Sequence, residues 1–378
     1  MSFIHLGLGW IDDRGGGLER YQHGVCAAHA ALGQDVTAWL QSRSPVGGDI
    51  RYPVIPYASP DSSRRTKLSR LQALAAERLR DPNFTFVSHH ASVSSELVPR
   101  LRDVPHVVHF HGPWADEAAI EGAPRWKTFL QRRAERTAYH SADRIITLST
   151  AFAELIVARY GVSPDVVRVV PGAIDAAAAD PRISRNEARE RLGWPLNRPI
   201  LISIRRLIKR VGVDILIEAT RQLVAKHPDL LVLVGGVGPL QGELAAAIER
   251  YGLTRNVRLL GFVPDDLLST AYAAADYSIV PTQALEGFGL VTLESMATGT
   301  PAIVTPVGSL PEVCGPLCES LVLPGKSAQA IAEGLDQILR GKTQLPDAAA
   351  CRRYVHENFD WGVIAPRVLG VYREADSR

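Results

Sequence analysis

Short apolar runs alternate with longer amphipathic segments along most of the chain. Runs bounded by Gly, Pro or Asp predict strands, and segments with an apolar residue every three or four positions predict helices. In the first half the predicted strands are 3–8, 36–40, 85–87, 106–110, 144–148 and 167–170. Because strands and helices alternate, we predict an α/β fold with parallel sheets covered by helices.

The same alternation starts again after a polar, alanine-rich stretch that runs from about residue 176 to 197. The second series of predicted strands is 200–204, 230–234, 257–260, 277–280 and 302–304. A chain of 378 residues also suits two cores better than one. We therefore predict two parallel-sheet domains, 1–172 and 173–356, followed by an amphipathic terminal segment, 357–378.

Charge and hydropathy narrow the class of protein. The formal net charge is +2 and no Lys/Arg-rich tail is present, so the sequence indicates no nucleic-acid partner. The first residues lack a basic segment followed by a long apolar run, and no stretch reaches the ~20 apolar residues of a membrane span. These features predict a soluble, cytoplasmic protein.

Two carboxylates flank a glycine-bearing loop near the end of the second series. The loop follows the strand predicted at 277–280 and should open a helix over 290–298. The backbone N–H groups of Phe288, Gly289 and Leu290, together with the helix dipole, would form a cradle for a diphosphate. Glu286 would then accept hydrogen bonds from sugar hydroxyls, and Glu294 from a ribose.

A second glycine-rich loop, 15–17, follows the first predicted strand and precedes a helical stretch at 21–32. Without Cβ atoms, Gly16 and Gly17 would let a diphosphate approach the backbone. A flexible turn is the alternative. The loop is neither the Gly-x-Gly-x-x-Gly of dinucleotide enzymes nor a Walker loop, because no Gly-Lys-Ser/Thr follows.

The segment from Glu286 to Glu294 resembles the Glu-x7-Glu motif of retaining glycosyltransferases of family 4, also called glycosyltransferase group 1. The resemblance extends over nearly the whole chain, through the glycine loop at 15–17, Phe-His-Gly at 110–112, the Arg-rich segment after 204, and the segments 234–239 and 308–312. It implies the GT-B fold, with an acceptor-binding and a nucleotide-sugar-binding Rossmann-like domain that face each other. It also implies that 357–378 crosses back as a helix onto the first domain.

The leaving diphosphate needs positive charge, and the sequence contains no Asp-x-Asp for a metal ion. The basic segment at 205–210 can supply this charge through guanidinium and ammonium groups. It departs from the family pattern, since Arg205 replaces a glycine and Val211 stands where a Lys is usual. We assign the cationic role to Arg206 with Arg210, and keep Arg205 and Lys209 as alternatives.

Other donor-binding positions follow the second-domain strands. Gly236 and Phe262 lie in loops that would form the nucleotide pocket, with ordinary strand-to-helix turns as the alternative. In the first domain, the resemblance implies that His111 lies beside the donor sugar. A structural histidine is the competing interpretation, and a metal site with His109 has no evident third ligand. His89 lines the acceptor side or is tucked into the core.

The segment 64–80 is basic and helical in pattern, with leucines on one side. It would rest on anionic lipid or pack as an ordinary amphipathic helix with a solvated basic face. Several aromatic and basic residues would extend a lipid surface: Trp126, Lys127, Arg132, Arg133 and Arg136. A peripheral contact with the inner face of the membrane would suit a lipid-linked acceptor.

Together these features predict a retaining, metal-independent glycosyltransferase that needs no cofactor. It would move a hexose from a nucleoside diphosphate sugar to a hydroxyl of a glycan, a lipid-linked glycan or a small molecule. The resemblance implies a same-face mechanism in which the departing phosphate helps to deprotonate the acceptor. The alternatives are a sugar-nucleotide epimerase or phosphorylase of the same fold, and a non-catalytic nucleotide-sugar-binding protein.

Overall fold

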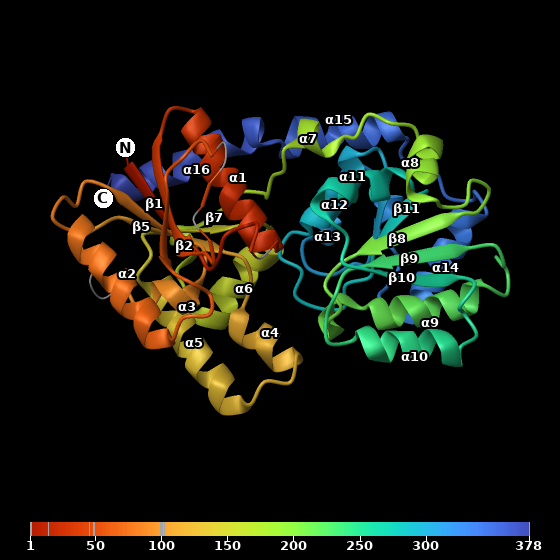
Figure 1. Cartoon of the computed structure of the whole chain (residues 1–378), viewed down its shortest axis with the longest axis horizontal. Coiled ribbons are helices and arrows are strands. Elements are labelled where there is room, and N and C mark those ends of the chain that lie inside the picture. Colours follow the sequence, from red (N-terminus) through yellow and green to blue (C-terminus); the bar gives the residue numbers. More distant parts are fainter. Residues whose placement is uncertain are drawn as a thin grey trace. The chain divides into compact units, whose positions relative to one another are not determined.

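The computed structural model of the chain describes residues 2–13, 15–44, 46–47, 50–98, 101 and 103–377. They form two compact units, Met1–Ala173 with Trp361–Arg378, and Ile174–Asp360 (Figure 1). The first boundary lies one residue later than expected, after Ala173, and the second lies four residues later than expected, after Asp360. The second shift arises because helix α15 (Ala348–Phe359) continues to Phe359, and Asp360 then accepts a hydrogen bond from the Ala176 backbone N–H of the second unit at 3.1 Å.

In the described part of the first unit, seven parallel strands pair in the order β3-β2-β1-β4-β5-β6-β7. Their bounds are β1 (Ser2–Leu6), β2 (Asp35–Gln41), β3 (Val54–Ala58), β4 (Thr85–Ser88), β5 (His106–Phe110), β6 (Arg144–Thr147) and β7 (Val167–Val169). The pattern of apolar positions did not predict β3, which contains Pro56. A proline is tolerated there because β3 is the edge of the sheet.

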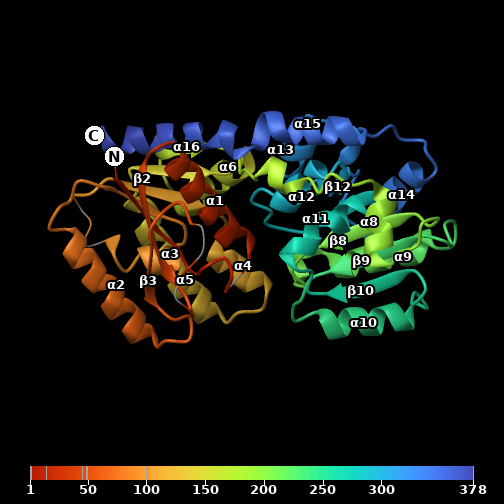
Figure 2. The ribbon, with the colours of Figure 1, turned by 45° about the horizontal axis from the view of Figure 1, so that its top comes forward.

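The helices of the first unit are α1 (Gly17–Ala31), α2 (Arg64–Arg78), α3 (Ala91–Ser94), α4 (Trp114–Ile120), α5 (Arg125–His140), α6 (Thr150–Tyr160) and α16 (Trp361–Asp376). The terminal helix α16 lies along α1 and against strands β4 to β6 (Figure 1, Figure 2). Its Glu374 accepts a hydrogen bond from Arg144 of β6 at 2.9 Å. The expected return of the chain terminus to the first domain is confirmed.

Helix α2 is the basic segment for which two interpretations were open. Its Leu71 and Ala75 are buried in a core cluster with Phe84 and Leu97. Ser63 caps its N-terminus by accepting a hydrogen bond from the Thr66 N–H at 3.2 Å. The apolar side of α2 is thus used within its own unit, as expected of an ordinary packed helix.

The described part of the second unit contains five parallel strands in the order β10-β9-β8-β11-β12. Their bounds are β8 (Ile200–Ile204), β9 (Leu231–Gly235), β10 (Val257–Gly261), β11 (Tyr277–Val280) and β12 (Ala302–Val304). Its helices besides α15 are α7 (Ala176–Ala179), α8 (Arg185–Leu192), α9 (Val213–Leu223), α10 (Gln241–Arg250), α11 (Asp265–Ala273), α12 (Leu290–Ala297), α13 (Leu310–Cys314) and α14 (Ala328–Leu339).

Local sequence signals account for several helix ends. Ser149 caps α6, and Ser184 with Glu187 forms a reciprocal capping box at the start of α8. Both helices end at a glycine in the left-handed conformation, Gly161 at φ 69° and Gly193 at φ 64°. In the described residues we find no helix whose length and apolar content would suffice to cross a bilayer.

The strand orders decide where side chains meet. In each sheet the chain winds outward from its first strand and then returns to that strand's other side, so a switch point lies between β1 and β4 and another between β8 and β11. Open parallel sheets bind ligands beyond the carboxyl ends of their strands at such points. The segments that follow β4 and β5 carry His89 and His111, and those that follow β8 and β11 carry Arg205 and Glu286.

Candidate functional site

A buried ion pair lies at the switch point of the second unit. Arg205 follows β8 directly, and its Nη2 lies 2.5 Å from Oε2 of Glu286 in the loop after β11. The side chains are 9% and 10% exposed. Thr282 joins both residues, because its hydroxyl accepts from Arg205 Nη1 at 2.7 Å and donates to Glu286 Oε2 at 2.8 Å. The three side chains therefore form one satisfied polar cluster.

Burial raises the pKa of the Glu286 carboxyl, but the positive charge and hydrogen bond of Arg205 and the hydrogen bond of Thr282 outweigh it. The net pKa of Glu286 lies below its usual value, so the group is a carboxylate at neutral pH. Its Oε2 accepts from both neighbours. Oε1 is therefore the carboxylate oxygen left to accept a hydrogen bond that a sugar hydroxyl would donate.

The cation paired with Glu286 is Arg205, one of the two alternatives predicted to contact the diphosphate. Arg206, the next residue along the chain, is exposed. Lys209 is also exposed, whereas Arg210 is half-buried, donates to the Leu285 carbonyl at 3.1 Å and lowers the pKa of Glu286 through its charge. Arg205 and Arg210 therefore lie beside Glu286, and the assignment of Arg206 with Arg210 to the leaving diphosphate stays a prediction.

The backbone around Glu286 is tightly constrained. Leu285 adopts φ 54°, an uncommon conformation for a branched residue. A Cβ on Gly308 would lie 2.2 Å from the Glu286 carbonyl oxygen, and Gly308 itself adopts φ 57°. The next residue, Ser309, donates its backbone N–H to the same oxygen at 3.2 Å. Gly308 is therefore required for the loop that positions Glu286.

Helix α12 begins immediately after this loop. Its N-cap is Gly289 at φ 79°, and no side chain among the described residues caps it. Phe288 is buried and packs against Phe359, with ring centroids 5.8 Å apart. Leu290 and Glu294 are half-buried, with Glu294 one turn into the helix. An uncapped helix N-terminus leaves N–H groups for an anion, which is the arrangement expected of a diphosphate cradle.

The glycine loop after β9 supports the Arg205 segment. Gly236 adopts φ 123°, and a Cβ there would lie 1.9 Å from the Arg205 carbonyl oxygen. A Cβ on Gly238 would similarly lie 2.4 Å from the Leu207 carbonyl oxygen. Phe262, beyond β10, is 67% exposed. The contact with the Arg205 carbonyl shows that Gly236 is needed where two backbones pack closely, which is not the nucleotide contact predicted for it.

In the first unit, Gly16 is the N-cap of α1 and Gly17 its first residue. The helix therefore begins four residues earlier than the helical stretch expected from residue 21. Gly16 is half-buried and Gly17 exposed. The buried residue of this first turn is Glu19, at 5% exposure.

Three histidines form a hydrogen-bonded chain at the switch point of the first unit. His5 of β1 contacts His89 through its Nδ1 and the Nε2 of His89, 2.9 Å apart. His89 in turn contacts His111 through its Nδ1 and the Nε2 of His111, 3.4 Å apart. His89 is 1% exposed, so it is tucked into the core. His111, the last of the three hydrogen-bonded rings, is half-buried.

Burial is the main reason why these imidazoles are neutral at pH 7. It lowers the pKa of His111 to about 3, with a smaller contribution from His90. The pKa values of His5, His89 and His109 are also well below the usual value, through burial and then through neighbouring histidines. Neutral imidazoles can donate and accept hydrogen bonds or bind a metal ion.

The expectation that His109 and His111 lack a third metal ligand was wrong. His89, His109 and His111 each place one nitrogen within 4.8 Å of the others. Pairwise, however, their rings are inclined by only 14° to 23°. Nδ1 of His89 and Nε2 of His111 already face each other in a hydrogen bond, so a metal ion on both rings would have to replace that bond. The signal missed in the sequence was that 89 and 111 follow strands that pair in the sheet.

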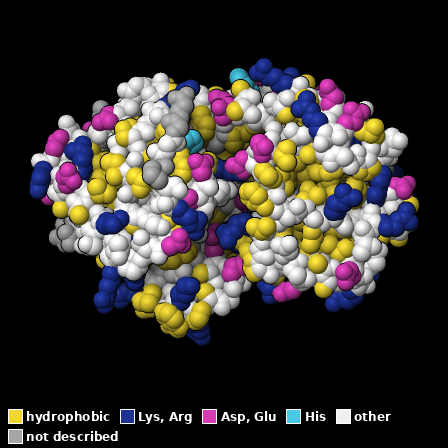
Figure 3. All heavy atoms as spheres, viewed as in Figure 1, with side chains coloured by type: hydrophobic (Ala, Val, Ile, Leu, Met, Phe, Trp, Pro, Cys, Tyr) yellow, Lys and Arg dark blue, Asp and Glu magenta, His cyan; other side chains and the backbone are white. Residues whose placement is uncertain are grey.

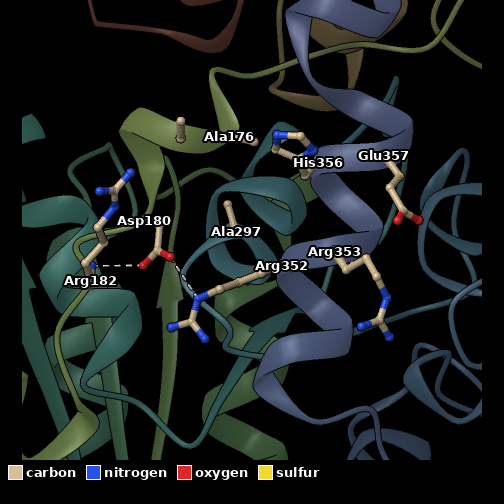
Figure 4. Close-up of a pocket in the computed structure, with 9 residues that line it drawn as sticks. Ala176, Asp180, Arg182, Ala297, Arg352, Arg353, His356 and Glu357 are labelled. Atoms are coloured by element: carbon tan, nitrogen blue, oxygen red, sulfur yellow. Dashed lines mark hydrogen bonds and ion pairs between the residues drawn. The ribbon is translucent and has the colours of Figure 1, made fainter.

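The second unit also contains a pocket that none of the site residues described above lines. It has a volume of about 360 Å³ and is lined by α7, α15 and the end of α12 (Figure 4). Arg352 Nε lies 3.0 Å from Asp180 Oδ2 there, and Ala297 is the last residue of α12. The expected diphosphate cradle is at the other end of that helix, and none of the expected site residues lines the pocket.

The chain is similar in sequence to two family models and to proteins of known activity. Residues 15–178 match the family model described as Glycosyltransferase Family 4, and residues 184–357 match Glycosyl transferases group 1. A D-inositol 3-phosphate glycosyltransferase of Acidothermus cellulolyticus is 32% identical over 322 residues, which are 80% of this chain and 70% of that protein.

Two solved structures have the same fold. A sucrose-phosphate synthase from Thermosynechococcus elongatus has a TM-score of 0.80 at 21% identity, with both chains covered completely. Anabaena Alr3699/HepE in complex with UDP-glucose has a TM-score of 0.78 at 18% identity, with 98% of each chain covered. The GT-B fold expected from the sequence is confirmed.

Proposed function

Because the chain belongs to the group 1 glycosyltransferases, we propose that it transfers a hexose from a nucleoside diphosphate sugar to a hydroxyl acceptor, with retention of configuration and without a metal ion. The observation that carries the proposal is the buried Arg205–Thr282–Glu286 cluster beside the uncapped start of α12. It combines a fixed positive charge, a carboxylate and free backbone donors in one place.

The diphosphate is the leaving group, and its charge must be stabilised as the bond to the sugar breaks. Arg205 and Arg210 supply positive charge, and the N-terminus of α12 supplies backbone donors and the helix dipole. The guanidinium of Arg205 is held by two hydrogen bonds, so it need not reorganise during the reaction. Fixed protein charges of this kind can replace a metal ion.

Glu286 orients the sugar, with Oε1 accepting from a hydroxyl, and Glu294 accepts from the ribose. The acceptor oxygen forms a bond to the anomeric carbon on the face from which the phosphate oxygen leaves. The acceptor proton moves to that departing phosphate oxygen, so no protein nucleophile is required. His111 contacts the transferred sugar.

UDP-hexoses are the first donors to test, since HepE is described in complex with UDP-glucose. D-inositol 3-phosphate is the first acceptor to test, because the Acidothermus relative is named for it. A lipid-linked glycan is the second kind of acceptor, and α5 supports it. Trp126, Phe129 and Leu130 are 67%, 61% and 55% exposed on that helix.

Basic residues flank this apolar surface of α5. Figure 3 shows hydrophobic side chains gathered over α5 among those of Lys and Arg. Arg125, Lys127 and Arg133 belong to the helix and are exposed. An exposed apolar strip with flanking cations is typical of a helix that lies on anionic lipid. We therefore place the proposed peripheral membrane contact on α5, whereas α2 uses its apolar side for packing.

Nucleotide release tests the function. UDP-, GDP- and ADP-hexoses are incubated with acceptor, with and without EDTA, for the wild type, Glu286→Ala and the exposed control Glu249→Ala. We expect release from one donor that EDTA does not change, that Glu286→Ala loses and that Glu249→Ala retains. Release that EDTA abolishes would contradict the metal-free mechanism. Tight nucleotide binding without release from any donor and acceptor would favour a non-catalytic binding protein.

A further inference from the structure

The histidine chain of the first unit ends on a buried nitrogen without a partner. Nε2 of His5 is buried and makes no hydrogen bond with any described residue. Its other nitrogen, Nδ1, contacts His89, and His89 contacts His111. Because a neutral imidazole has one N–H and one lone pair, fixing one ring fixes the direction of every bond in the chain.

Only two directions are possible. In the first, His5 donates from Nδ1 to His89, and His89 donates from Nδ1 to Nε2 of His111. The unpartnered Nε2 of His5 is then a lone pair. In the second, every bond is reversed and His5 carries an orphaned N–H in the core. Orphaned buried N–H groups are rarer than under-satisfied acceptors, so the first direction is favoured.

We propose that His5 and His89 are positioning residues that hold His111 in the tautomer protonated at Nδ1. The Nε2 of His111 is occupied by the proton of His89, so His111 presents Nδ1–H to a bound ligand. It can donate to an oxygen of the donor sugar but cannot accept a proton there. This inference rests on the proposed function for the identity of the ligand, and on the chain of contacts alone for the tautomer.

The surroundings hold the chain in place. His89 stacks on His109 with ring centroids 4.6 Å apart, and His109 Nε2 lies 2.7 Å from the hydroxyl of Tyr372 on α16. Tyr21 of α1 packs edge-on against His111, with ring centroids 4.9 Å apart. Elements from both ends of the chain sequence therefore enclose the three rings.

The wild type tests the tautomer directly. Protein labelled with 15N-histidine is examined at pH 7 by long-range proton–nitrogen correlation spectra, which distinguish Nδ1–H from Nε2–H rings, and His111→Asn assigns the His111 signals. We expect the Nδ1–H pattern for His111. An Nε2–H pattern or a charged ring would overturn the inference. Because no turnover is needed, this result is independent of whether the proposed transfer is found.

Substitutions test whether the hydrogen bonds from His5 to His89 and from His89 to His111, here called the relay, set the tautomer of His111. In His89→Phe the donor to His111 is lost, so we expect its signals to move toward the Nε2–H pattern and kcat to fall about 10-fold to 100-fold. His106→Phe is the matched control, since His106 is also buried and neutral but lies at the other end of β5 and contacts Ser88. We expect His106→Phe to leave the His111 tautomer and kcat unchanged. An unchanged His111 tautomer in His89→Phe would overturn the relay.

If His89→Phe does not fold, His5→Phe takes its place, because it removes the N–H that donates to His89. The His111 tautomer and kcat are measured in the same way, with the same expected changes. Zinc titration of the wild type supplies a further check, because a metal ion on His89 and His111 would need both lone pairs. We expect no stoichiometric zinc binding and no change in the His111 signals on adding Zn²⁺. Stoichiometric binding that is lost in His89→Phe would overturn the relay in favour of a metal site.

Discussion

The two units build their sites at equivalent points of similar sheets but by different physical means. In the first unit, neutral imidazoles contact one another in a buried chain. In the second, a full positive and a full negative charge are buried together and bridged by Thr282. The strand order of a Rossmann-like sheet therefore sets which residues meet at the switch point. Burial and the hydrogen-bond or ion-pair partners of each side chain determine whether it carries a charge.

The ion pair and the row of histidines should respond differently to substitution and to acid. A buried charge pair is strongly destabilised when one partner is removed, because the other charge stays buried without compensation. A buried chain of neutral histidines tolerates substitution of a single ring better but opposes protonation, since a charge would then be buried without a carboxylate beside it. Variants and pH should therefore affect the two units differently.

Removal of Glu286 should give the largest effect. In Glu286→Ala the Arg205 guanidinium loses its carboxylate while remaining buried, so we expect a loss of about 3 to 5 kcal/mol in the free energy of unfolding. Transfer should fall at least ~100-fold, because the sugar also loses its proposed acceptor group. Urea unfolding and initial rates measure these effects. A loss below about 1 kcal/mol would show that the ion pair is not buried as described, and the exposed Glu249→Ala should change neither quantity.

Mild acid should weaken the first unit before the second. His29 is a buried residue of α1 in the first unit. The folded pKa values of His29 and His111, about 4 and about 3, lie below the unfolded value of 6.5. The unfolded state therefore binds protons first, and stability falls as pH drops below about 6.5. At pH 5 this amounts to about 2 kcal/mol for each of these histidines. The pKa of Glu286 is lowered, so its contribution persists above about pH 4.5 and is lost only below that.

Hydrogen exchange at pH 7 and pH 5, after correction for the intrinsic pH dependence, measures this contrast. Peptides from β4 and β5 should lose protection at pH 5, while peptides from β8 and β9 keep theirs. Equal loss in both sheets would argue against the buried, neutral state of the histidines. The same loss in His29→Gln as in the wild type would remove His29 as a contributor.

Replacing Gly308 by alanine should destabilise the loop that positions Glu286. In Gly308→Ala the new Cβ would lie 2.2 Å from the Glu286 carbonyl oxygen, at a residue with φ 57°. We expect a loss of about 3 kcal/mol from the clash and the backbone strain together. Gly341→Ala is the matched control, because φ is 66° and nothing lies within 4 Å of the new Cβ, so only about 1 kcal/mol of strain is expected. Thermal unfolding of both variants would show whether the clash contributes beyond the strain.

The smallest effect on stability is expected for the exposed surface of α5. Trp126→Ser combined with Phe129→Ser should change the free energy of unfolding by no more than about 0.5 kcal/mol, because both side chains already face solvent. Sedimentation with vesicles of phosphatidylglycerol should nevertheless show weaker binding than for the wild type. Leu267→Ser, at an exposed leucine of the second unit, should leave vesicle binding unchanged. Equal binding by all three proteins would remove α5 as the lipid contact.

The local structure of the candidate site in the second unit was largely predictable from residue types and order. The loop from Glu286 to Glu294, its helix start and the glycines of both units were identified from local patterns, since a strand, a glycine loop and a helix leave clear local signals. The partner of Glu286 was not identified. Arg205 and Arg206 are adjacent and chemically identical, and only the direction of each side chain at the end of β8 separates them.

Local patterns of residues were enough to predict the alternation of elements, the two parallel sheets and the loops that carry the candidate site residues, because periodicity and turn residues act over short distances. Which charges pair and which histidines touch follows from three-dimensional packing. His5, His89 and His111 lie on three separate segments, and His109 meets Tyr372 from the opposite end of the chain. Such contacts depend on the order in which strands pair and on the packing of α16, and no local pattern of residues encodes either.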